Sequence, residues 1–246
     1  MDASDQQLMH LSWAMCGVIV VHLLLLPYTF KTTPKDKHWV NLLLLYFHLL
    51  FVPVLVVCSL HSVYVLGDNV ESRWHATTTT AYINMLLTCA EDVVHLPVLW
   101  FSKDCTMSMV LQYVVHHALT CVGLGTMLYT SRMHYFACLG GLCEITNVFL
   151  NTILTFQYLG LPRGKMYIVC GFLLWLSFVF FRLMLFPYWL YVFYTDVQSN
   201  PTTTWDMVSP LERYQYPFAN FVLLVLSAIW FVPITKGLIK AVMGAH

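Results

Sequence analysis

The stretch VLQYVVHHALTCVGL, residues 110–124, sets two adjacent histidines inside an apolar run long enough to cross a membrane. A helix rises about 1.5 Å per residue, so about 20 mainly apolar residues span a hydrocarbon core of roughly 30 Å. Seven such runs occur along the chain, at about 8–30, 39–66, 74–101, 107–130, 134–159, 166–194 and 216–240. The sequence therefore predicts an all-α polytopic membrane protein with about seven transmembrane helices.

The overall composition agrees with a protein built for lipid. Hydrophobic residues make up 59% of the 246 residues, charged residues make up 10%, and the mean hydropathy is +0.70. An ordinary soluble domain is about half apolar and about a quarter charged, so we expect one membrane domain and no soluble one. The formal net charge is zero and no basic or acidic block occurs, which gives no reason to expect a nucleic-acid partner.

Basic residues are unevenly divided between the breaks that separate the runs. Eight of them lie in the first, third and fifth breaks and toward the C-terminus, namely Lys31, Lys35, Lys37, Lys103, Arg163, Lys165, Lys236 and Lys240. The opposite breaks hold only Arg73, Arg132 and Arg213. Because positive residues gather on the cytoplasmic side, this division favours an odd number of spans with the N-terminus on the lumenal side.

Two runs carry polar residues at helical spacing. In the third run these residues are Thr77, Thr80, Asn84, Thr88, Glu91 and His95. In the fifth run they are Gly140, Glu144, Asn147, Asn151, Thr155 and Tyr158. Steps of three and four residues place each set on one face of a helix, so each run is expected to have one polar face.

The charged residues inside the runs predict where these faces point. A charge that faces lipid at mid-depth costs on the order of 3 kcal/mol, so Glu91, Asp92, Glu144 and Arg182 are expected to face protein or trapped water. The arrangement that satisfies all four gathers the third to sixth runs around one internal polar cavity.

A structural reading of the same residues stays open. Polar residues between membrane helices often serve only as interhelical hydrogen-bonding groups. The isolated histidines His22, His48 and His61 are interpreted in this way, as interhelical hydrogen-bonding residues without a role in a site.

The paired histidines suit acid–base or nucleophilic chemistry. A neutral imidazole can accept a proton from an amine or hydroxyl that attacks an acyl carbonyl, or can carry the acyl group itself. His117 and Glu144 form a plausible acid–base pair if their helices pack together. Metal binding is the competing chemistry, and Glu91 and His95 are spaced i, i+4. The chain lacks HxxxH and HxxHH boxes, so no metal ligand set is predicted.

Five motifs in order and spacing resemble a known family. They are SRWHATT (72–78), AED (90–92), VVHHALT (114–120), EITNVFLN (144–151) and FFRLMLFPYWLY (180–191). Together they resemble the TLC domain shared by translocating-chain-associating membrane proteins, Lag-type ceramide synthases and smaller TLC-domain-containing proteins. The resemblance implies a TLC-type helical bundle over residues 35–240, preceded by an N-terminal transmembrane helix and first loop (1–34) and followed by a short tail (241–246).

The resemblance also implies roles for individual residues. In the ceramide synthase branch, the paired histidines carry acyl transfer from acyl-CoA to a sphingoid base. His116 and His117 inherit that catalytic role here, with Glu144 orienting one of them. Residues expected to bind substrate, from the resemblance and the polar stripe together, are Trp74, His75, Asn84, Glu91, Asp92, His95, Asn147, Asn151 and Arg182. Acyl-CoA is then a co-substrate, and no tightly bound cofactor is expected.

The chain departs from the synthase branch at one motif. The synthases follow the HisHis pair with a His-Asp pair and further acids, whereas GGLCEITNVFLN carries Glu144 alone. The match is therefore to the small TLC-domain group. Three functions stay open: a lipid acyltransferase, a lipid-binding protein without chemistry, and an accessory subunit, in a homo-oligomer or a larger membrane complex.

The compartment follows from the family and not from a signal. The first run lacks a small-residue cleavage site, so we expect a retained helix and not a secretory signal. An endoplasmic-reticulum-type membrane is favoured by the resemblance, and the mitochondrial inner membrane is the alternative.

Overall fold

A computed structural model describes residues 3–35, 39–100, 107–161 and 164–243. This part of the chain contains no strand, and its α-helices are α1 (Ala3–Thr32), α2 (Trp39–Leu66), α3 (Val70–His75), α4 (Thr79–Trp100), α5 (Met107–Thr130), α6 (His134–Gly141), α7 (Ile145–Tyr158), α8 (Lys165–Phe178), α9 (Leu185–Ser199) and α10 (Pro210–Val242). The prediction of an all-α polytopic membrane protein is confirmed.

The number of spans differs from the prediction. In the described residues, six helical stretches are long and apolar enough to cross a membrane, namely Gln6–Thr32, Trp39–Leu66, Met107–Thr130, His134–Tyr158, Lys165–Ser199 and Pro210–Val242. The predicted count of seven is not confirmed, because α4, in the third run, is not among the six. Its 22 residues extend about 33 Å, but its polar stripe lowers its hydropathy.

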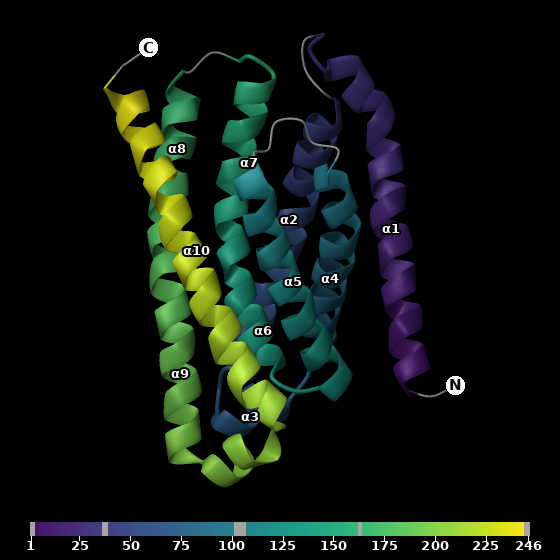
Figure 1. Cartoon of the computed structure of the whole chain (residues 1–246), viewed down its shortest axis with the longest axis vertical. Helices are drawn as coiled ribbons and strands as arrows, with labels where there is room; N and C mark the ends of the chain where they lie inside the picture. Colours follow the sequence, from purple (N-terminus) through teal and green to yellow (C-terminus); the bar gives the residue numbers. More distant parts are fainter. Residues whose placement is uncertain (1–2, 36–38, 101–106, 162–163, 244–246) are drawn as a thin grey trace.

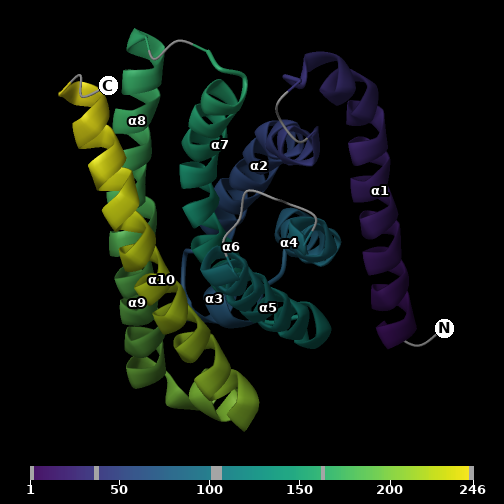
Figure 2. The same cartoon turned by 45° about the horizontal axis from the view of Figure 1, so that its top comes forward.

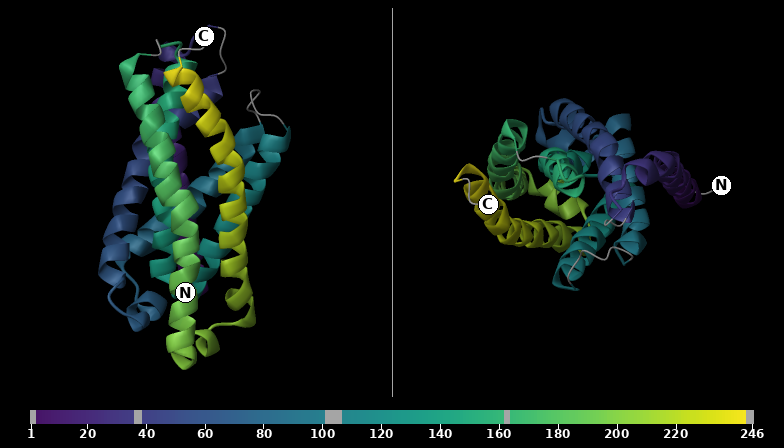
Figure 3. Two further views of the ribbon diagram at one scale, coloured as in Figure 1. Left: turned by 90° about the vertical axis from the view of Figure 1, so that its left-hand side faces the viewer. Right: turned by 90° about the horizontal axis from the view of Figure 1, so that it is seen from above.

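The helices form an elongated bundle. Figures 1 and 2 show α8, α9 and α10 on one side, α1 on the opposite side, and α2, α4, α5 and α7 between them. Seen from above in Figure 3, α1 lies outside the other helices, and it packs against α2 and α4. The first helix is thus peripheral, and the polar faces meet among the later helices.

Basic residues in the described segments gather at one end of the bundle. Lys31 lies in the last turn of α1, Lys165 begins α8 and Lys240 lies in the last turn of α10, and Figure 1 places these three helix ends together, opposite the N-terminus. The predicted division of charge agrees with this arrangement. Lys37, Lys103 and Arg163 lie outside the described residues.

A cluster of buried aromatic residues lies where α3, α6 and α9 meet. The Phe136 ring contacts Trp74, Trp189 and Phe193 with centroid separations of 5.6, 5.1 and 5.8 Å. The indole of Trp189 also donates a 2.9 Å hydrogen bond to the Phe136 carbonyl. Around the perimeter, large apolar side chains such as Leu24 are exposed, as expected of surfaces that face lipid acyl chains.

Two irregular turns interrupt long helices in the interior. A 3₁₀ turn at Leu142–Glu144 joins α6 to α7, and a π-helical turn at Val179–Met184 joins α8 to α9. The two turns contact each other. Because π-helical turns often occur at functional sites, their meeting point marks an interior region of interest.

Candidate functional site

The polar stripe of α4 faces α2. The amide of Asn84 donates a 2.5 Å hydrogen bond to the Ser59 hydroxyl, and Thr80 and Ser62 share a hydrogen bond of 2.9 Å. Asn84, Ser59 and Ser62 are buried. The one-faced stripe expected from spacing is therefore present, and its partner is the second apolar run.

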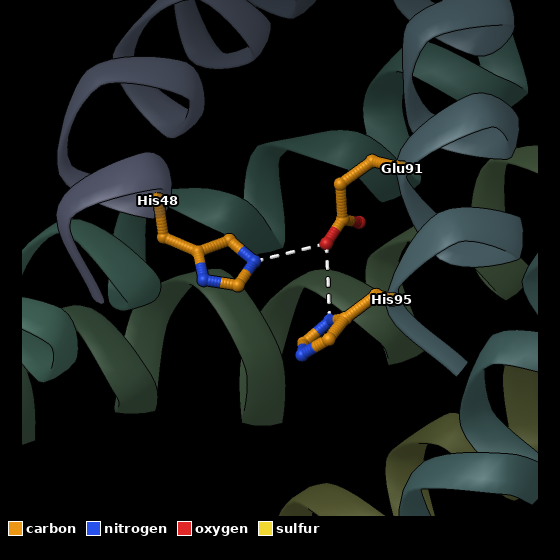
Figure 4. A group of neighbouring side chains, drawn as sticks. All are labelled: His48, Glu91 and His95. Atoms are coloured by element: carbon orange, nitrogen blue, oxygen red, sulfur yellow. Dashed lines mark hydrogen bonds and ion pairs between the residues drawn. The ribbon is translucent and has the colours of Figure 1, made fainter. Parts of the chain in front are cut away.

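Glu91 joins α2 and α4 deeper in the bundle. Its Oε1 atom lies 2.9 Å from Nε2 of His48 and 3.1 Å from Nδ1 of His95. Figure 4 shows the two imidazoles converging on this one carboxylate from different helices. His95 occupies the position one turn after Glu91 on α4, so their contact follows from helical geometry. His48, interpreted from the sequence as an interhelical hydrogen-bonding residue, does form such a bond, and its partner is a carboxylate of this polar cluster.

Asp92 turns toward α5. Adjacent residues of a helix point about 100° apart, so Asp92 reaches a different neighbour from Glu91. Its Oδ1 atom accepts a short hydrogen bond from Nδ1 of His117, and its Oδ2 atom lies 3.8 Å from the Cys121 thiol. Asp92 and His117 are both buried. The Asp92 carboxylate thus orients the imidazole through Nδ1 and leaves its other nitrogen, Nε2, for a different partner.

His116 lies beside this pair and faces α10. Its ring centroid is 5.4 Å from that of His117 and 5.7 Å from that of Trp230. The Trp230 indole donates a 2.7 Å hydrogen bond to Gln112. Nδ1 of His116 is buried without a hydrogen-bond partner. The HisHis pair thus offers one oriented imidazole and one whose buried nitrogen is unsatisfied.

The two irregular turns supply the remaining charges. Asn147 donates a 2.7 Å hydrogen bond to Glu144. Arg182 donates from Nε to the Thr146 hydroxyl at 2.9 Å, and its Nη2 lies 3.5 Å from the side-chain amide oxygen of Asn147. The guanidinium also lies over the Trp230 ring, 5.8 Å from its centroid. Trp230 therefore contacts both Arg182 and His116.

The pairing expected for His117 is corrected by these contacts. His117 binds Asp92, whereas Glu144 accepts hydrogen bonds from Asn147 and from the Cys143 thiol. Glu144 still lies within electrostatic range of His48, Asp92 and His117. The Glu144 carboxylate can therefore affect the His117 imidazole electrostatically, although the two groups do not form a hydrogen bond.

Two predicted substrate-binding residues lie away from this cluster. The Trp74 indole donates a 3.1 Å hydrogen bond to Asp196, and Trp74 is fully buried. His75 donates a 2.6 Å hydrogen bond to the Thr203 carbonyl. Both residues connect α3 to α9 and the turn after it, and the structure does not bring them together with the histidines. Asn151 is buried one turn beyond Asn147 on α7.

Two residues of the cluster could not be identified from the sequence. His48 and Trp230 sit in apolar runs without a neighbouring polar stripe, so spacing could not identify them.

The structure also gathers two overlapping sets of possible metal ligands, His48 with Glu91 and His95, and Glu91 with Asp92 and His117. In each set the donor atoms lie within 4.8 Å of one another.

The sequence is also similar to a known protein family. The family model of the TLC domain, which covers TRAM, LAG1 and CLN8 proteins, matches residues 38–236. No curated protein and no solved structure matches the chain. Because the family model covers most of the sequence, the chain belongs to the TLC-domain family.

Proposed function

We propose that this protein transfers an acyl group to an amine- or hydroxyl-bearing membrane lipid, with His117 as general base. TLC-domain membership indicates a membrane lipid-related function. The observation that carries the finer proposal is the hydrogen bond between His117 and Asp92, buried between α4 and α5. Acyl-CoA, a thioester, is the donor class that fits this chemistry.

The pair is arranged as a base and its orienting carboxylate. When a carboxylate binds Nδ1 of an imidazole, it fixes the tautomer, leaves Nε2 free to accept a proton, and stabilises the imidazolium that forms. In the proposed reaction, Nε2 of His117 takes the proton from the lipid amine or hydroxyl as that atom attacks the thioester carbonyl. The carbon–sulfur bond then breaks, and the proton passes to the leaving thiolate.

His116 and Arg182 support the same step from the other side. His116 serves as a second base or as a transient acyl carrier, since its Nδ1 atom makes no hydrogen bond. Arg182 is buried and held by Thr146, so it offers a fixed positive charge to a developing oxyanion or an anionic headgroup. Asn147 contacts Arg182 and also donates a hydrogen bond to Glu144.

The test is production of a lipid in membranes and by purified protein. Wild type, His117→Gln and Asp92→Asn are expressed at equal levels, together with His61→Gln, a control that removes a histidine hydrogen-bonded to Thr80 outside the cluster. Quantitative lipidomics identifies the product, and purified protein is then assayed with labelled acyl-CoA. We expect a product that His117→Gln abolishes and His61→Gln retains. Identical profiles from well-folded proteins contradict the proposal.

A second function is favoured by the sequence departure after the HisHis pair. Synthases carry a His-Asp pair there, whereas this chain has Glu144 alone. The same polar cluster then holds a lipid without chemistry. Co-purified lipid that depends on His117, in a protein without turnover, supports this alternative. A stoichiometric protein partner in mild detergent supports an accessory role.

A further inference from the structure

We propose that His48, Glu91 and His95 bind one divalent transition-metal ion between α2 and α4. No other part of the described chain brings two imidazoles onto a single buried carboxylate oxygen. This inference goes beyond acyl transfer and does not depend on it, because it concerns a different carboxylate and different imidazoles from the His117–Asp92 pair.

The donor spacing suits a metal with ligands at right angles. With metal–ligand bonds of about 2.1 Å, donors at about 90° lie about 3 Å apart. The two nitrogens lie 2.9 and 3.1 Å from Oε1 of Glu91. Figure 4 shows a nitrogen of each ring next to this oxygen. Two histidines and one carboxylate on one side of an ion leave further coordination positions for water or a lipid oxygen.

One of the donors is unsatisfied without an ion. Nδ1 of His95 is buried and makes no hydrogen bond, although it lies 3.1 Å from Glu91. A buried polar atom without a partner costs about 1–3 kcal/mol. An ion placed between this nitrogen and the carboxylate satisfies both groups. This nitrogen is therefore an independent indication of a ligand.

The local charge also favours a cation. Three carboxylates lie in this region, those of Glu91, Asp92 and Glu144, and the guanidinium of Arg182 lies with them. With neutral histidines, the group carries two formal negative charges. Uncompensated charge is costly inside a membrane, and one divalent cation neutralises the group without protonating any imidazole.

The other candidate set is less suited to an ion. It also uses Glu91, but with Asp92 and His117. His117 already forms a hydrogen bond with Asp92 through Nδ1, the atom it would offer to a metal. In the first set His48 has a similar bond to Glu91, but Nδ1 of His95 has none to break. The ligand set is therefore assigned to His48, Glu91 and His95.

The metal class follows from the ligand chemistry. Imidazole nitrogen suits zinc, iron, copper and nickel, while magnesium and calcium prefer oxygen ligands. We therefore expect Zn²⁺ or Fe²⁺ to bind, and Mg²⁺ and Ca²⁺ not to displace them. The probes are Zn²⁺, measured by elemental analysis, and Co²⁺, which reports its ligand geometry by optical absorption.

The experiment measures bound metal in the full chain. Wild type, His48→Gln, His95→Gln, His117→Gln and His61→Gln are purified in detergent through a tag without histidine. Each is loaded with Zn²⁺ or Co²⁺, washed, and analysed for metal per chain, with size exclusion and circular dichroism as checks of folding. His61 lies on α2 like His48, so His61→Gln is a matched control for loss of a histidine from that helix.

We expect about one ion per wild-type chain, and binding weakened at least tenfold in His48→Gln and His95→Gln. His61→Gln and His117→Gln are expected to retain the ion. If folded wild-type protein holds only background metal, the proposal is wrong. Loss of metal in His117→Gln, with retention in His48→Gln, overturns the ligand assignment. Turnover is not the readout, so failure here is distinct from failure of the transferase proposal, which His117→Gln tests separately.

Discussion

Arg73 and Asp196 lie 123 residues apart in the sequence and form a two-pronged ion pair between α3 and α9. Nε of Arg73 lies 2.8 Å from Oδ2 of Asp196, and Nη2 lies 2.5 Å from Oδ1. The carboxylate raises the pKa of the Arg73 guanidinium, so the arginine stays charged at any physiological pH. The Trp74 indole donates to the same carboxylate. The pair therefore connects α3 to α9.

The substitution Asp196→Asn is expected to destabilise the protein by about 3 kcal/mol. It removes one charge of a largely buried pair and leaves Arg73 without its counterion. Unfolding in mixed micelles, followed by circular dichroism as denaturing detergent is added, gives the free energy. Asp206→Asn is the control, because Asp206 is an exposed aspartate a short distance along the chain. Equal effects of the two substitutions contradict a structural role for the pair.

The positions of the helices could be predicted because lipid imposes a simple rule. A helix that crosses a membrane needs a continuous apolar run, and the runs at 39–66 and 107–130 coincide with α2 and α5. The breaks at Leu142–Glu144 and Val179–Met184 could not be predicted. They depend on contacts with other helices, which local spacing does not record.

The site was predictable only in part, for a related physical reason. Periodicity showed that Glu91 and His95 share a face of α4, since that relationship lies within one helix. The partner of that face, His48, is 43 residues from Glu91, and a single histidine in an apolar run gives no sign of its neighbour. The choice of Asp92 over Glu144 as partner of His117 depends likewise on which helices pack together.

The adjacent glycines Gly140 and Gly141 give a test of close packing at the end of α6, next to the 3₁₀ turn. A Cβ atom on Gly141 would lie 2.8 Å from the Ser59 hydroxyl oxygen, whereas a Cβ on Gly140 would meet nothing within 4 Å. Ser59 cannot rotate away freely, because its hydroxyl accepts the hydrogen bond from Asn84. Gly141→Ala is therefore expected to destabilise the protein by about 1–3 kcal/mol.

Gly140→Ala is the matched control, and it is expected to be neutral or to stabilise by about 0.5–1 kcal/mol through helix propensity. Both variants are compared by unfolding in the same mixed micelles. If Gly141→Ala were as stable as Gly140→Ala, the packing of α6 against α2 at this point would be looser than the structure indicates.

Arg182→Lys is expected to lower the free energy of unfolding although it keeps the positive charge. The planar guanidinium donates to Thr146 and reaches Asn147 while lying over Phe178 and Trp230. An ammonium group cannot reproduce both the directed hydrogen bonds and the stacking. We expect a loss of about 1–3 kcal/mol, measured as above, together with altered fluorescence of the tryptophans. Arg132→Lys, at a half-buried arginine that donates a hydrogen bond to the Met207 carbonyl, serves as the control, and equal stability of the two variants would argue against a positioned guanidinium.

His117 and Asp92 are expected to act as one unit in turnover. Asp92→Asn preserves the shape of the side chain but favours the wrong tautomer of His117, and the expected loss of kcat is about 10²–10⁴-fold. Removing the imidazole in His117→Gln removes the base that Asp92 serves. The double variant should therefore lose little more than His117→Gln alone, since residues that act together are strongly non-additive. Initial rates of product formation by the four purified proteins test this relationship. Losses that multiply would mean that Asp92 acts on the substrate independently of His117, and the hydrogen bond between them would then serve packing instead of proton transfer.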